Sequence, residues 1–179
     1  VRNLRHARSL SPGEWKIYGL LGTCFARLGQ YTKALDYYRK ALLYNPQASL
    51  PYLDMGKLYY EHKKSLLAKE YFSKAIANNP RNAQAAYYAG RAAFDEGNEE
   101  EGLRWITTAI KLDPDQITFY EQLGSWYWRK KDYVHFIQAA KNMLRLNPES
   151  GRLYHLLGIA YAENKMYQKA FYCFTQAIK

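Results

Sequence analysis

The chain has 179 residues, of which 48% are hydrophobic, and its 26 Lys and Arg residues against 16 Asp and Glu residues give a formal net charge of +10. This composition suits one domain with an extended core, and no apolar run approaches the ~18 residues of a transmembrane helix. Two cysteines, Cys24 and Cys173, exclude a disulfide scaffold, and we expect both to be buried packing residues.

The prolines follow a strict period. Five of the six stand 34 residues apart, at Pro12, Pro46, Pro80, Pro114 and Pro148. A fixed period of this length is typical of a solenoid, in which each repeat is a helical hairpin that buries its apolar face against its neighbours. The sequence therefore predicts an all-α solenoid. The predicted units are residues 15–48, 49–82, 83–116, 117–150 and, stopping before its proline, 151–179.

Each unit carries two helical patterns. In the first, a large residue is followed three positions later by an adjacent Leu and Gly, and three positions after the Gly by an aromatic residue, as in Tyr18-x-x-Leu21-Gly22-x-x-Phe25. In the second, an Ala, an aromatic residue and another Ala follow, as in Ala34-x-x-x-Tyr38-x-x-Ala41. These spacings place the large side chains on one stripe of each helix. The Gly and Ala mark positions where two helix backbones approach closely, which outweighs the helix penalty of Gly.

These columns resemble the tetratricopeptide repeat (TPR), which has the same large-x-x-Leu-Gly-x-x-Tyr, Ala-x-x-x-Phe and Pro positions. The resemblance covers essentially the whole chain. It implies a right-handed TPR superhelix of antiparallel helix pairs with a 34-residue repeat. It also implies that the first helix of each pair lines a concave face that binds a partner.

Residues 1–14 are expected to form the end of a preceding repeat, its second helix. If Pro12 closes that repeat, Leu4 and Ala7 fall in its aromatic and final Ala columns. We therefore expect the sequence to be a fragment of a longer array. Open apolar ends of this kind would favour self-association.

The third unit departs most from the columns. Ala86, Ala89 and Ala93 stand where other units have large residues, so its core should be thinner. Its turn is rich in acids between Gly97 and Glu101, which suits a solvated helix start better than a cation site. In the fourth unit Phe136 and Ala140 exchange columns, a swap that conserves volume and should require only local repacking.

The resemblance implies which side chains line the concave face. The middle units offer rings and a few charges there, and Tyr, Trp and Arg together are the composition of a binding hot spot. The candidate binding residues are Lys57, Tyr60, Tyr87, Tyr88, Arg91, Phe94, Glu121, Gln122, Trp128 and His155. Some of these rings are expected to pack between repeats instead, whereas Tyr87 and Tyr88, beside the Ala columns, are expected at the surface.

Some TPR proteins hold the C-terminal carboxylate of chaperones with Lys, Asn and Arg side chains on the concave face. The matching positions here carry Gly19, Thr23, Asp54, Gln84 and Tyr88, none of which has the required type. The sequence therefore argues against a chaperone-tail clamp.

No catalytic pattern is present. The four His residues lie in different units, and there is no Cys-x-x-Cys, His-Glu-x-x-His or Gly-rich phosphate loop, so we predict no enzyme activity, cofactor or metal site. The sequence favours a protein-interaction scaffold that binds a peptide or helix in the concave groove. One alternative is a non-catalytic recognition or regulatory array of a larger enzyme or assembly machine.

The positive charge raises RNA binding as a further alternative. The third unit carries −4 while residues 1–14 and the other units carry +2 to +4, so the basic surface is interrupted and this alternative is less favoured. Nothing in the sequence decides between a cytoplasmic and a periplasmic location.

Overall fold

The computed structural model describes residues 14–178, and within that range it contains α-helices and no strand. The predicted end of a preceding repeat falls almost entirely on residues 1–13, outside the described part. The ten described helices are α2 (Glu14–Arg27), α3 (Tyr31–Tyr44), α4 (Ser49–Glu61), α5 (Ser65–Asn78), α6 (Ala83–Asp95), α7 (Glu99–Leu112), α8 (Ile117–Arg129), α9 (Tyr133–Leu146), α10 (Gly151–Glu163) and α11 (Tyr167–Ala177).

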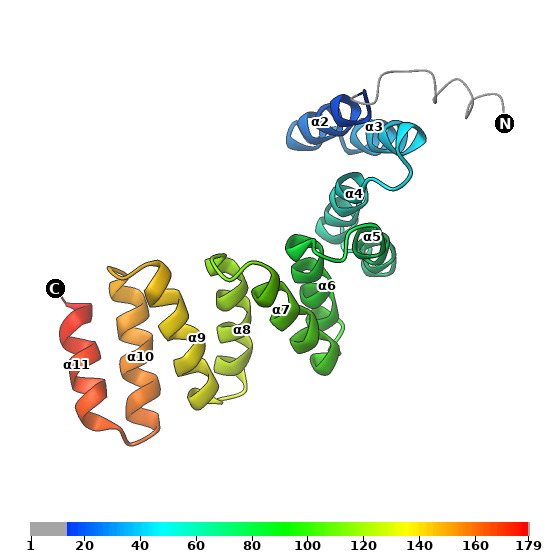
Figure 1. Ribbon diagram of the computed structural model, residues 1–179. Helices are drawn as coiled ribbons and strands as arrows, with labels where there is room; N and C mark the ends of the chain where they lie inside the picture. Colours follow the sequence, from blue (N-terminus) through cyan, green and yellow to red (C-terminus); the bar gives the residue numbers. More distant parts are fainter. Residues whose placement is uncertain (1–13, 179) are drawn as a thin grey trace. The chain divides into compact units, whose positions relative to one another are not determined.

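Consecutive helices pair as antiparallel hairpins: α2 packs against α3, α4 against α5, α8 against α9, and α10 against α11 (Figure 1). The second helices α3, α5 and α9 are each followed by a capping Asn with an extended or nearly extended backbone: Asn45, Asn79 and Asn147. Each Asn precedes a proline, which pushes it out of the helical region. The proline period therefore sets the ends of these helices.

The chain divides into two compact units, Val1–Trp105 and Ile106–Lys179, with the division inside α7. In the first unit α4 contacts both α2 and α6, so the first helices of successive pairs are neighbours. In the second unit α10 packs on α9 as well as on α11. No described helix has the length and apolar character needed to cross a membrane.

The Gly column is where an aromatic ring of the second helix meets the first helix. A Cβ added to Gly22 or Gly56 would lie 2.6 Å from the ring of Tyr38 or Phe72, respectively. Both rings are buried. The structure thus differs from the expectation that two helix backbones meet here, because the group that lies against Gly is the ring of the second helix. A larger residue at these positions would displace the ring.

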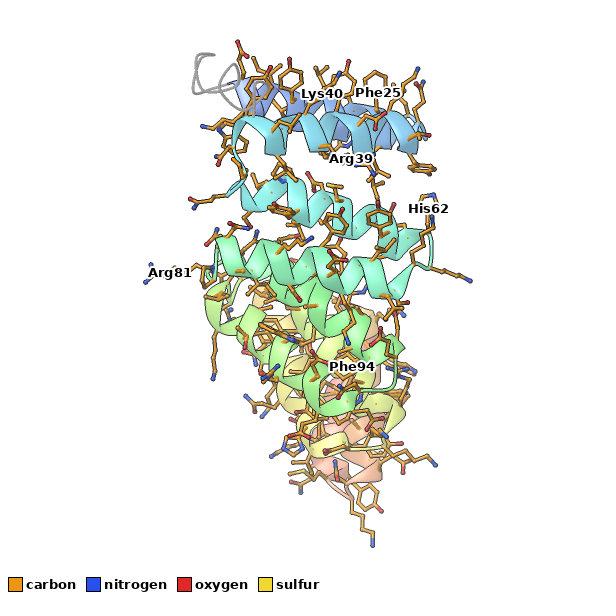
Figure 2. All side chains as sticks on the ribbon, turned by 90° about the vertical axis from the view of Figure 1, so that its right-hand side faces the viewer. Phe25, Arg39, Lys40, His62, Arg81 and Phe94 are labelled. Carbon is orange, nitrogen blue, oxygen red and sulfur yellow. The ribbon has the colours of Figure 1, made fainter. Side chains whose placement is uncertain are left out.

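The third hairpin has a further close contact. Besides Gly90, which is buried in the usual column of α6, it has Gly102 in the Ala column of the second helix, where a Cβ would lie 2.5 Å from the ring of Phe94 on α6 (Phe94 is labelled in Figure 2). Ile106 occupies the usual aromatic column and is fully buried. Phe94, a predicted binding residue, thus fills space inside its own hairpin.

In the fourth hairpin Phe136 and Ala140 are both buried, and α8 and α9 run without a break. The expected local repacking is visible at Gly124, because a Cβ there would lie 3.2 Å from Met143 and 3.6 Å from Phe136. The neighbours of Gly124 are therefore looser than the rings that press on Gly22 and Gly56.

One cysteine differs from the expectation. Cys173 is buried, but Cys24 on α2 is exposed, so the prediction for Cys24 was wrong. Leu58 and Ala92 occupy the same column of the next two hairpins and are buried against the hairpin that precedes each of them.

Candidate functional site

Five of the predicted binding residues come together in the first unit. They lie on the first helices α4 and α6, which are in contact. We call this set the Tyr–Arg cluster: Lys57, Tyr60, Tyr87, Tyr88 and Arg91.

Arg91 is the centre of the cluster. Its guanidinium carbon lies 5.1, 5.6 and 5.7 Å from the ring centroids of Tyr60, Tyr87 and Tyr88. Such contacts between a cation and the faces of rings are attractive, and more so when partly shielded from water. Burial alone would lower the pKa of Arg91, but its interactions with the three tyrosines and Asp95 outweigh burial and raise it. Arg91 is therefore a charged group held in a fixed place.

Tyr88 links the cluster to the core. Its ring stacks on Phe72, with centroids 5.6 Å apart, and meets Tyr87 edge-on at 5.2 Å. The ammonium of Lys57 lies 5.0 Å from the Tyr88 centroid. The expected surface position was wrong for Tyr88, because its ring is half-buried and packs on the core cluster that contains Phe72. Tyr87 is also half-buried.

Asp95 is a member of the site that the sequence reasoning missed. It is the last residue of α6, and its carboxylate accepts a hydrogen bond from the Tyr60 hydroxyl. Burial and this bond raise the pKa of Tyr60 to about 12, so the hydroxyl stays a donor at neutral pH. Asp95 stands four residues after Arg91, and that helical spacing is the signal that could have identified it.

A polar path extends from the cluster toward α2. The Asp54 carboxylate lies 3.7 Å from the Lys57 ammonium. Burial raises the pKa of Asp54, while Lys57 and the Thr23 hydroxyl oppose that rise. Thr23 in turn accepts a hydrogen bond of 3.3 Å from the Tyr38 hydroxyl. Thr23 and Asp54, noted in the sequence only as mismatches to a chaperone clamp, are therefore part of a connected surface.

The second unit contains a pocket of about 520 Å³ among α8, α9 and α10. Two of the predicted residues, Glu121 and Trp128, line it. We call it the second-unit pocket, and its lining is Ile117, Glu121, Ser125, Trp128, Arg129, Phe136, Met143, Asn147, Ser150, Arg152, Leu153 and Leu156.

The exchanged columns of the fourth hairpin explain where the pocket lies. Phe136 and Met143, the side chains nearest to Gly124, form part of its wall. The Trp128 ring meets Phe136 edge-on at 4.8 Å and so fixes one side. Since Ala140 stands where most hairpins place a ring, Gly124 is less tightly covered.

The lining of the pocket carries more positive than negative charge. Arg129 and Arg152 line it together with one acid, Glu121. Neither arginine forms an ion pair with another described residue. Arg129 is the residue here that the sequence reasoning missed, because it lies one position beyond the expected concave column.

The remaining predicted residues belong to neither the Tyr–Arg cluster nor the second-unit pocket. Gln122 on α8 and His155 on α10 do not line the pocket. The His155 ring is exposed and lies 5.9 Å from that of Phe174. Phe94, as described above, packs within the third hairpin.

The acid-rich turn before α7 has a structural role. The Asn98 carboxamide oxygen accepts a hydrogen bond of 3.2 Å from the Glu101 backbone N–H, which caps the helix. The Lys69 ammonium lies 2.7 Å from Glu96 and 3.6 Å from Glu101. Within residues 14–178 no group of three or more His, Cys, Asp or Glu side chains is placed to hold a metal ion.

Known proteins with a similar sequence or structure agree with the fold described above. The BBSome complex member BBS4 of Bos taurus is 24% identical over 161 residues, which is 90% of this chain and 31% of that protein. The chain thus spans about a third of the length of this relative. The crystal structure of MamA superposes with a TM-score of 0.76 at 24% identity, covering 94% of this chain and 92% of MamA.

A second solved structure, that of YrrB, described as a TPR protein with an unusual peptide-binding site, gives a TM-score of 0.70 at 20% identity. It covers 90% of this chain and 83% of YrrB. These structures share the TPR solenoid fold with the chain. Family models of the tetratricopeptide repeat match residues 15–47 and residues 53–117, together more than half of the sequence. The chain therefore belongs to the tetratricopeptide repeat family.

Proposed function

We propose that the chain binds an extended or helical segment of a partner protein, with the Tyr–Arg cluster as the main anchor. The TPR fold supports a protein-interaction scaffold in general, and the scaffold family is generally non-catalytic. The observation that carries the proposal is the assembly of three tyrosines, an arginine and a lysine on neighbouring first helices.

The cluster suits binding because its side chains are already ordered. Arg91 is held by rings, and Tyr60 is held by Asp95, so little rotamer freedom remains to be lost when a partner binds. Tyr and Arg in this kind of setting are the residues whose truncation costs an interface about 2 kcal/mol or more. A partner would stack on the half-buried Tyr87 ring and hydrogen-bond to the guanidinium.

The relatives add support of two kinds. YrrB, which has the same fold, is described as having a peptide-binding site. BBS4 is named as a member of a complex and is much longer than the matched region. We therefore also propose that this chain is the non-catalytic recognition array of a larger protein or assembly, a role that peptide binding would serve.

Affinity capture from extract of the source cells tests the proposal. The wild-type chain is compared with a Tyr87→Ala, Arg91→Glu double variant, whose helicity is verified by circular dichroism. The matched control is Arg81→Glu, which makes the same charge change at an exposed loop residue (Figure 2). Each capture is repeated after nuclease treatment, which removes RNA, because RNA binding is the competing hypothesis.

We expect one protein to be retained by the wild-type chain and by Arg81→Glu, and lost by the double variant, with or without nuclease. Equal capture by all three would contradict the groove as the binding surface. If nuclease treatment alone abolished the capture, the result would support RNA binding instead of peptide binding. Self-association through the exposed apolar residues of α2 and α11, such as Leu20 and Phe171, is checked separately as a mass that rises with concentration.

A further inference from the structure

We infer that the second-unit pocket binds a partner segment in which a large apolar side chain stands beside a carboxylate. The inference rests on the proposed function, since it names the chemistry of a segment that such a scaffold would hold. It concerns a site on α8, α9 and α10 that does not share residues with the Tyr–Arg cluster.

The apolar part of the partner is indicated by the wall of the pocket. The rings and aliphatic groups around a space of about 520 Å³ come from three helices: Trp128 on α8, Phe136 and Met143 on α9, and Leu153 and Leu156 on α10. Pockets that bury small ligands are about 300–1,000 Å³ in volume and mostly apolar. One Leu, Phe or Trp side chain together with the adjoining backbone fits this description, and burying it would remove the exposed part of Trp128 from water.

The carboxylate is indicated by the two arginines. Arg129 ends α8, and Arg152 lies in the first turn of α10, where the helix dipole also favours an anion. Both are exposed and neither is in an ion pair with a described residue. A guanidinium with free donors binds a carboxylate through two parallel hydrogen bonds, and the contact gains strength when an apolar group beside it excludes water.

Glu121 limits how acidic the segment should be. With two arginines and one glutamate the lining has a net charge of +1, so it matches one carboxylate rather than a run of acids. Glu121 can instead accept a hydrogen bond from a backbone N–H of the segment. The phosphates of an RNA backbone would be repelled by the Glu121 carboxylate and would lie against apolar side chains. The lining therefore favours a peptide over RNA.

The test is a selection from a library of short random peptides displayed on phage, with the whole chain as the target. Enriched peptides are then synthesised with a fluorescent label, and their affinity is measured by fluorescence anisotropy. Two variants probe the pocket: Ser125→Trp, which fills it from an exposed position on α8, and Arg152→Glu. The matched control is Lys141→Glu, a change of the same sign on α9 outside this pocket.

We expect the enriched peptides to place Asp or Glu next to a large apolar residue. Binding should weaken at least about tenfold in both pocket variants and stay unchanged in Lys141→Glu. Enrichment of basic or purely polar peptides would overturn the inference, and so would binding that survives both pocket variants. Peptides made with an amidated and with a free C-terminus show whether the carboxylate is that of a side chain or of the chain end.

The result also separates this inference from the proposed function. If peptides bind and depend on Arg91 but not on Ser125 or Arg152, the pocket inference fails while the proposed function stands. If no peptide is enriched, both fail. A single-stranded RNA oligonucleotide that binds the wild-type chain more tightly than any selected peptide would also overturn the inference.

Discussion

At the scale of a single residue, Asp54 is the acid whose surroundings affect its charge most clearly. Burial raises its pKa above the ordinary value of 3.8, although Lys57 and Thr23 counteract part of that rise. The folded chain therefore binds a proton at Asp54 more tightly than the unfolded chain does. The ionised carboxylate lowers the stability of the fold, and this loss develops as the pH rises from 3.8 through the raised pKa and persists at neutral pH.

Replacing Asp54 by Asn should therefore stabilise the fold at pH 7, because the neutral amide avoids the cost of a partly buried charge. The expected rise in Tm is up to about 3 °C, since a substitution of this kind changes the free energy of unfolding by about 1 kcal/mol or less. The difference from the wild type should shrink as the pH falls toward 3.8, where the carboxyl of the wild type takes up its proton. Thermal unfolding followed by circular dichroism at several pH values measures both effects. If Asp54→Asn were less stable than the wild type at pH 7 and equally stable at low pH, the attraction between Asp54 and Lys57 would outweigh the cost of burying the carboxylate.

The residues of the candidate site could be predicted only in part. The repeat columns identified the positions of Tyr60, Tyr87 and Arg91, because a helix presents the same face at the same position of every unit. They did not distinguish a ring on the surface from one in the core, as Phe94 shows, since that depends on Gly102 in the next helix. Asp95 belongs to the site through a hydrogen bond with a residue of another helix, which no pattern within one unit contains.

At the scale of the helix pair, the contact between glycine and ring decides how closely two helices approach. The recurring columns of the sequence predicted a close approach of two helices at Gly, but not that an aromatic ring would be the group in contact. They also did not predict the two departures. Gly102 receives Phe94 from the first helix, and Gly124 is left with looser neighbours, because in both hairpins the ring comes from an unusual column.

Gly56→Ala tests the contact. The added Cβ would lie 2.6 Å from the ring of Phe72, which is fully buried, so the ring or the helix must shift. We expect the free energy of unfolding to fall by about 1–3 kcal/mol, the usual cost of overpacking a core. Urea denaturation provides the measurement.

Gly19→Ala is the matched control, because a Cβ there has nothing within 4 Å. Gly19 lies inside α2, so this change should leave the packing intact and raise stability by up to about 1 kcal/mol through helix propensity. If Gly56→Ala were as stable as Gly19→Ala, the ring would not be confined by the hairpin as described.

At the scale of the whole molecule, the period of 34 residues was sufficient to predict the architecture. A repeat array is built from contacts between neighbours, so one correct unit implies the next. The distribution of charge also has a structural reading. Two of the acids of the third unit are used locally, since Glu96 and Glu101 lie beside Lys69 of the second unit.

The central claim is that the first helices, rather than the second, hold the partner. Photo-crosslinking tests it most directly, with benzoylphenylalanine in place of Tyr87 on α6 or, as the comparison, in place of Leu66, which is exposed on the second helix α5. Both variants are incubated with the protein that the wild-type chain captures. We expect a crosslink from position 87 that is mapped to one peptide of the partner, and none from position 66. A crosslink from position 66 alone, or equal crosslinks from both, would contradict it.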